Sequence, residues 1–132
     1  MIHSVRFKAV LDTNVIYPVY IRDLLLWFAH YELFTPKWSE NICLEWESVM
    51  LRKEVPPTVI SKAKQKINLA FPDAMVQNYK GLIQHLDLPD PKDRHVLAAA
   101  IKANAHLIIT HNLKDFPDSY LSTFKLYSLT IF

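Results

Sequence analysis

The sequence predicts a single α/β domain in which helices cover both faces of a largely parallel sheet. Short apolar runs typical of buried strands alternate along the chain with longer amphipathic segments typical of helices. The 132 residues are enough to bury one core without disulfides or a structural metal. Hydrophobic residues make up 51% of the chain and charged residues 21%, as in folded proteins. We therefore expect one three-layer α/β/α domain over residues 1–132.

The first part of the chain predicts two strands with a helix between them. The run VRFKAVLD (residues 5–12) is typical of a first strand, and its apolar end stops at Asp12, where polar residues favour a turn. A helix is expected over about residues 19–30. The run ELFTP (32–36) is typical of a short second strand, which we expect Pro36 to break.

The middle of the chain is expected to be helical. Ser39 is a favourable N-cap for a helix over about residues 40–52. Thr58 is expected to cap the next helix, over residues 59–71. A proline then separates this helix from residues 73–79, which we expect to form another helical piece.

The last part predicts a helix, a buried strand and a terminal strand. The helix is expected from Pro91 to about Asn104, and the apolar run HLIIT (106–110) that follows is typical of a buried strand. Residues 115–124 are expected to be irregular or a short helix. The run KLYSLTIF (125–132) alternates as a terminal strand would. Its expected common face carries Tyr127, Leu129 and Ile131.

Composition excludes several classes of protein. The formal charge of +2 is too small to indicate nucleic-acid binding by itself. Gly81 is the only glycine, which argues against the glycine-rich loops that bind nucleotide phosphates. The single Cys43 cannot form an intramolecular disulfide and is expected to serve packing, and no signal peptide is indicated. These two features favour a reducing cytoplasm. No apolar run approaches the roughly 20 residues of a membrane span, so no membrane contact is expected.

Polar and acidic residues follow two of the predicted strands. Asp12 comes directly after the first strand, and Thr110, Asn112 and Asp115 follow the strand at 106–110. Open α/β sheets bind ligands beyond the carboxyl ends of their strands, so these side chains are the first candidates for a site. Taken alone, Asp12 is more often a plain turn residue.

Two further aspartates stand at the start of the helix predicted from Pro91. Asp90 is well explained as its N-cap. Capping does not fully explain Asp93, because a helical period places its carboxylate on the buried face of that helix, where acids rarely lie without a partner. The side chains that share this face are Val96, Leu97 and Ala100. In the helix at 40–52, periodicity does not choose between Glu45 and Glu47 as a second candidate acid.

These motifs together resemble a known family. The runs AVLDTNVI, TPKWSENICLEW and LPDPKDRHVLAAAIKANAHLIITHNLKDFP are similar to the PIN domain, particularly to VapC-like ribonuclease toxins. The resemblance extends over about residues 8–118 and is absent from about 53–80. It implies an acidic quartet and a set of supporting polar residues. The quartet is Asp12, Glu45, Asp93 and Asp115. The supporting residues are Thr13, Asn14, Thr110 and Asn112, with Asp90 as a cap or a second supporting group.

The resemblance implies a metal-dependent endoribonuclease that hydrolyses RNA phosphodiester bonds as the toxin of a toxin-antitoxin pair. Carboxylates from four segments suit a hard cation, Mg²⁺ or Mn²⁺, whereas the six histidines show no spacing typical of zinc sites. Such proteins are expected to form homodimers and to be silenced by a cognate antitoxin, whose helix occupies a groove near the site. In this chain the apolar-rich helices at 19–30 and 40–52 could supply that groove, although both could equally be core. The competing interpretation is a PIN-like module that binds RNA or a protein without catalysis.

A locally basic stretch offers candidates for contacting RNA. Lysine and arginine side chains near phosphates give sequence-independent affinity, but the same residues could form an ordinary solvated helix face. The candidates are Arg52, Lys53, Lys62 and Lys66, with Lys64 and Lys80 nearby. The tryptophans at 27, 38 and 46 are expected to be core or interface residues.

Overall fold

A computed structural model describes residues 7–130 of the chain. Its sheet has four strands in the order β2-β1-β3-β4, and all three pairings are parallel. The strands are β1 (Phe7–Leu11), β2 (Phe34–Lys37), β3 (Leu107–Ile109) and β4 (Tyr127–Leu129). The predicted parallel sheet is therefore confirmed, and the carboxyl ends of its strands meet at one edge.

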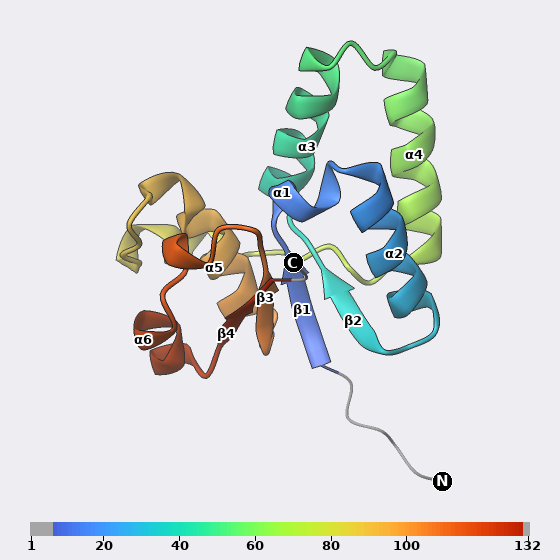
Figure 1. Cartoon of the computed structure of the whole chain (residues 1–132). Helices are drawn as coiled ribbons and strands as arrows, with labels where there is room; N and C mark the ends of the chain where they lie inside the picture. Colours follow the sequence, from blue (N-terminus) through green and yellow to red (C-terminus); the bar gives the residue numbers. More distant parts are fainter. Residues whose placement is uncertain (1–6, 131–132) are drawn as a thin grey trace, which may run out of the picture.

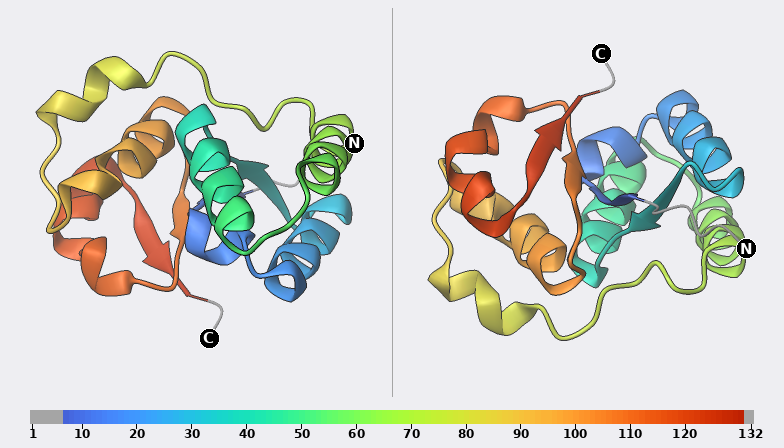
Figure 2. Two further views of the ribbon diagram at one scale, coloured as in Figure 1. Left: turned by 90° about the horizontal axis from the view of Figure 1, so that it is seen from above. Right: turned by 90° about the horizontal axis from the view of Figure 1, so that it is seen from below.

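Helices cover both faces of this sheet. Within residues 7–130 the α-helices are α1 (Thr13–Ile16), α2 (Val19–His30), α3 (Glu40–Arg52), α4 (Pro57–Ala70), α5 (Arg94–Lys102) and α6 (Asp118–Leu121). The 3₁₀ turns are η1 (Lys80–His85), η2 (Pro91–Asp93), η3 (Leu113–Asp115) and η4 (Ser122–Phe124). Figure 2 shows α3 and α5 on one side of the sheet, with α1, α2 and α6 on the other. In Figure 1, α3 and α4 form an antiparallel pair that extends past the sheet.

The core is formed where α5 packs on the centre of the sheet. Ala9, Val10 and Leu11 of β1 are at most 1% exposed, and residues 96–100 of α5 are fully buried. The three alanines of α5 bring its backbone close to β1 and β3, since small side chains leave little space between packed elements. This packing places the start of α5 beside the carboxyl ends of both strands.

Two segments differ from the sequence expectation. Residues 13–16 form α1 rather than a plain turn, because the Asp12 carboxylate accepts a hydrogen bond from the Thr13 N–H and caps the helix. Residues 73–79, expected to be helical, run extended instead. Their backbone bonds to Trp38, which accepts from the Val76 N–H at 2.8 Å and donates to the Ala74 carbonyl at 3.1 Å. The apolar side chains of this segment are thereby buried, which outweighs its helix propensity.

Several element boundaries also differ. Pro36 lies inside β2 rather than ending it. The helix α4 begins at Pro57, whose fixed φ suits the first helical position, so Thr58 does not cap it. The helix expected over 91–104 begins as η2 and continues as α5. Residues 5 and 6 of the predicted first strand and Ile131 of the last lie outside the described residues.

The outer edge of β4 is capped by a side chain. Tyr127 donates its N–H to the His106 carbonyl, on the β3 side, so the N–H of the next residue, Ser128, points away from the sheet. The Asp118 carboxylate accepts bonds from this N–H and from the Ser128 hydroxyl, both at 3.1 Å. No helix in residues 7–130 is both long and apolar enough to cross a bilayer.

Candidate metal and catalytic site

Asp12 joins the ends of β1 and β3. Its N–H donates to the Ile109 carbonyl at 3.0 Å, so it continues the pairing of the two strands before the chain turns into α1. The carboxylate is almost fully buried, at 6% exposed. Its Oδ1 accepts from the Thr13 N–H at 2.8 Å, and its Oδ2 accepts from the Thr110 hydroxyl at 2.9 Å. These two bonds fix the orientation of the carboxylate.

Thr110 is the centre of a small polar network. Its hydroxyl donates to Asp12 and accepts from the Asn14 side-chain amide at 3.3 Å and from the Asn112 N–H at 3.1 Å. A hydroxyl has one donor and two acceptor positions, so all three are used. Asn14 in turn accepts from the His111 N–H at 3.1 Å. The network holds the loop after β3 against Asp12, although the Asn112 side chain itself is exposed.

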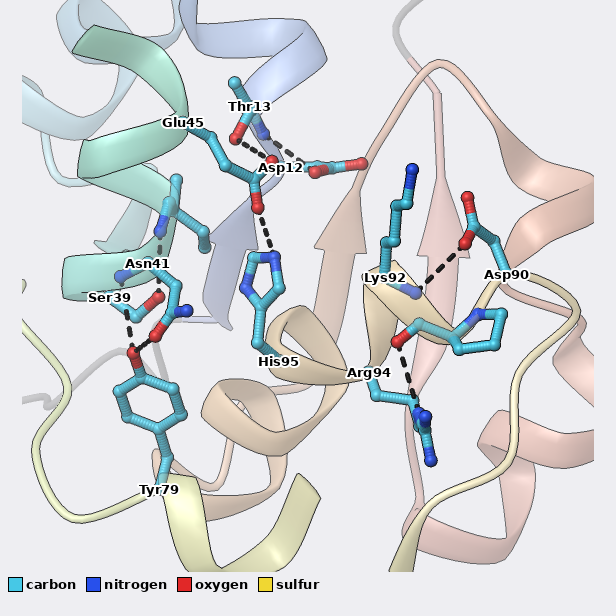
Figure 3. Close-up of polar contacts among 12 residues, drawn as sticks. Asp12, Thr13, Ser39, Asn41, Glu45, Tyr79, Asp90, Lys92, Arg94 and His95 are labelled. Atoms are coloured by element: carbon cyan, nitrogen blue, oxygen red, sulfur yellow. Dashed lines mark hydrogen bonds and ion pairs between the residues drawn. The ribbon is translucent and has the colours of Figure 1, made fainter. Parts of the chain in front are cut away.

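Glu45 is held between α1 and α5. Figure 3 shows its carboxylate with one oxygen toward Thr13 and the other toward His95. The Thr13 hydroxyl donates to Oε2 at 3.3 Å, and the His95 Nε2 contacts Oε1. The alternative acid of the same helix, Glu47, instead forms an ion pair with Lys64 at 2.8 Å. The geometry therefore links Glu45, rather than Glu47, to Asp12 through Thr13.

His95 was not among the predicted site residues. Its ring is buried, and Nδ1 has no hydrogen-bond partner among residues 7–130. Since a carboxylate oxygen can only accept, Nε2 carries the proton that faces Glu45. A signal was available in the sequence, because His95 directly precedes the apolar run at residues 96–100 of an alanine-rich helix. A polar group at such a position requires a partner.

Asp93 lies where several carboxylates approach one another. Burial, followed by the charges of Asp12, Asp90 and Asp115, raises its pKa from 3.8 to about 6, against a smaller opposing effect of His95. The pKa of Asp12 is also raised, mainly by burial, although its bonds from Thr110 and Thr13 act in the opposite direction. The structure thus brings three acids of the proposed quartet within electrostatic reach of one another.

Asp90 occupies the capping position. Its carboxylate accepts from the Lys92 N–H at 3.0 Å, which caps η2, as Figure 3 shows. Its charge nevertheless contributes to the raised pKa of Asp93. Asp90 is therefore both a cap and a neighbour of the acidic cluster, by which we mean Asp12, Asp93 and Asp115.

The chain is similar to known proteins over the segments that carry these residues. A family profile described as the PIN domain matches residues 8–114. The chain belongs to the PIN domain family. It is 53% identical over 38 residues to the presumed ribonuclease VapC50 of Mycobacterium tuberculosis, a stretch that is 29% of this chain and 22% of that protein. Its fold is similar to that of VapBC2 from Rickettsia felis, crystallised bound to a DNA fragment from their promoter, with a TM-score of 0.59 and 18% identity. That match covers 93% of this chain and 98% of the other, and the resemblance seen in the motifs is confirmed.

The acids of this PIN domain suit a hard cation in their chemistry. Among residues 7–130, no three Asp, Glu, His or Cys side chains converge closely enough to form a complete set of direct ligands. Mg²⁺ usually keeps several waters and needs only one or two protein carboxylates, so a complete set is not required. Burial and, after it, the negative charges of neighbouring acids raise the pKa of Asp93, and a bound divalent cation would offset both effects on the carboxylate. Oxygen-only donors also fit Mg²⁺ or Mn²⁺ better than zinc.

The four basic candidates do not form one surface. Arg52 lines a cleft together with Thr13 and Glu45. Lys53 instead lies over the Tyr17 ring, 4.6 Å from its centroid. Lys66 lines a different pocket, between α2 and α4, and Lys62 is exposed on α4 without lining the cleft.

Proposed function

We propose that this PIN domain is a Mg²⁺- or Mn²⁺-dependent endoribonuclease. The observation that carries the proposal is the placement of Asp12 at the end of β1 and of Asp115 after β3, both close enough to the start of α5 for their charges to act on the half-buried Asp93. One or two of these carboxylates would hold the cation directly, and the others would contact its waters. A cation bound there supplies charge neutralisation at a phosphodiester and a water of lowered pKa. Hydrolysis of an RNA backbone is the reaction that this chemistry serves.

The remaining polar groups orient the acids. Thr110 fixes the direction of the Asp12 carboxylate, and Thr13 and His95 each hold one oxygen of Glu45. The Glu45 side chain is 48% exposed, so its unused lone pairs face solvent. We assign Glu45 the role of a ligand or of the group that positions the attacking water.

We further propose that the protein is a cytoplasmic toxin that forms homodimers and is silenced by an antitoxin. The relatives named VapC50 and VapBC2 support this assignment. So does the surface of α2, which is apolar on its outer side as well as toward the core. An apolar face that residues 7–130 leave uncovered suits a protein partner. The large exposed side chains of this face are Tyr20, Leu24, Trp27, Phe28 and Tyr31.

RNA cleavage by the purified protein tests the proposed function. We expect cleavage of a mixed single-stranded RNA in Mn²⁺ or Mg²⁺ and none in EDTA. Asp12→Asn and Asp93→Asn should each abolish it, because each removes a proposed ligand. Asp73→Asn is the matched control, since Asp73 is an exposed acid that makes no side-chain contact with the cluster. Cleavage that persists in EDTA and in both variants, or RNA binding without cleavage in either metal, would contradict the proposal.

A further inference from the structure

A cleft leads away from the candidate site along one face of α3. Its volume is about 310 Å³, and Thr13 and Glu45 of the site contribute to its lining. The other polar residues that line it are Asn41, Ser48 and Arg52. Positions 41, 45, 48 and 52 are three or four residues apart, so they form one stripe along the helix. The cleft is therefore continuous with the site at Glu45 and reaches the last turn of α3.

Arg52 stands at the far end of this stripe. Seven residues separate it from Glu45, which at 1.5 Å per residue is about 10 Å along the helix. Its side chain makes no hydrogen bond or ion pair with any of residues 7–130, whereas the neighbouring Lys64 is paired with Glu47. A favourable interaction with the helix dipole accounts for a basic residue in the last turn. The helix dipole does not account for a guanidinium that has no partner within residues 7–130 and lines a cleft leading to Glu45.

The other polar groups of the cleft are also placed to donate hydrogen bonds. The Asn41 Oδ1 accepts from the Tyr79 hydroxyl, so the amide nitrogen of Asn41 is turned away from this bond, and within residues 7–130 neither of its hydrogens is bonded (Figure 3). The Ser48 hydroxyl is exposed and forms no bond within residues 7–130. Apart from Glu45, the stripe carries two donor side chains, Asn41 and Ser48, and one cation, Arg52, a set that suits a chain of anionic oxygens better than a neutral ligand.

We propose that this cleft binds the single-stranded RNA on one side of the scissile phosphate, with Arg52 contacting a flanking backbone phosphate. This inference rests on the proposed function, because the RNA must enter at the acidic cluster. A guanidinium binds phosphate oxygens in a bidentate manner, which suits a fixed contact at a defined distance from the reacting bond. Ser48, which lies between Glu45 and Arg52 on the helix, would donate to a phosphate or ribose oxygen between the two points, and Asn41 would donate to an oxygen on the other side of Glu45.

Binding of a fluorescent single-stranded RNA, measured by anisotropy in EDTA, separates this subsite from catalysis. We expect Arg52→Gln to weaken binding about 5- to 10-fold. We also expect the slope of log K against log salt concentration to become shallower by about 0.7, the value for one lost phosphate contact on a single strand. Lys102→Gln is the matched control, since Lys102 also lies in the last turn of a helix but does not line the cleft. Arg52→Lys should restore the salt slope, because it keeps the charge.

The cleavage assay gives a second measurement on the same variants. Arg52→Gln should raise KM with little change in kcat, because the contact is made equally before and during the reaction. If Arg52→Gln binds RNA with the affinity and salt slope of the wild type, the subsite is wrong while the nuclease proposal stands. If the wild type neither binds nor cleaves RNA, both proposals are wrong. If Lys102→Gln weakens binding as much as Arg52→Gln does, the effect is one of overall charge and the subsite is again wrong.

Discussion

Replacing Asp93 by asparagine should stabilise the protein in the absence of divalent metal. The folded state raises the pKa of Asp93 from 3.8 to about 6, so it disfavours the ionised form relative to the unfolded chain. The protonated form of Asp93 therefore contributes to the free energy of unfolding. This contribution is fully present below pH 3.8 and is lost as the pH rises through about 6. Above that pH, the wild type folds with an ionised carboxylate among other acids. Asparagine has nearly the same shape and carries no charge.

The size of the effect follows from the pKa. The full shift corresponds to about 3 kcal/mol as an upper bound, at 1.36 kcal/mol per pKa unit. Asp93 is only partly buried, so solvent screening reduces this to about 1 to 1.5 kcal/mol. For a domain of this size, a gain of that size in the free energy of unfolding should raise the Tm of Asp93→Asn above that of the wild type by about 3 to 6 °C at pH 7.5.

Thermal unfolding in EDTA at pH 7.5 and at pH 4 measures this difference. The gain of Asp93→Asn over the wild type should be present at the higher pH and largely disappear at the lower, where Asp93 is protonated. Asp73→Asn should change Tm little at either pH, since its side chain lies outside the cluster. An Asp93→Asn protein that is no more stable than the wild type at pH 7.5 would refute the claim that these acids repel one another.

Three further outcomes are expected. Adding Mn²⁺ or Mg²⁺ should raise the Tm of the wild type but not that of Asp12→Asn, and an unchanged Tm of the wild type in both ions would argue against the metal site. His95→Asn should reduce RNA cleavage about 10-fold or more, because it releases Glu45. Leu97→Ala is the control: it creates a cavity in the same helix and costs about 2 to 5 kcal/mol of stability. At a temperature where both variants are folded, Leu97→Ala should not reduce cleavage. Equal cleavage by His95→Asn and wild type would contradict the role of His95. Thr110→Val should lower the free energy of unfolding in urea by about 1 to 3 kcal/mol, because Asp12 loses a donor, and Thr110→Ser should recover most of it.

Local patterns in the sequence were sufficient to predict the sheet and part of the site. The strands β1 and β3 are continuous apolar runs, so a parallel sheet and the meeting of Asp12 with Thr110 followed from the rule that parallel strands end at one edge. Asp93 was identified because a carboxylate on an alanine-rich face conflicts with its surroundings. In each case, the deciding feature lies within a few residues of the side chain concerned.

Features that depend on contacts between distant segments were not predicted. The helical propensity of residues 73–79 was overridden by backbone bonds to Trp38, far away in the sequence. The choice of Glu45 over Glu47 came from the family resemblance, because it depends on how α3 lies against α5, which periodicity within α3 does not determine. His95 was missed for the same reason, since its partner lies on another helix.

The capped edge of β4 limits how copies of this protein can associate. A strand from another chain could extend the sheet there only by taking the outward N–H of Ser128 away from Asp118. That exchange would deprive the aspartate of its backbone donor and would place a second backbone beside its negative charge. Homodimers and antitoxin complexes are therefore expected to form through helix surfaces, and the sheet of each copy is expected to end at its own β4. The capped edge also protects the protein against aggregation by strand addition, to which exposed edge strands are prone.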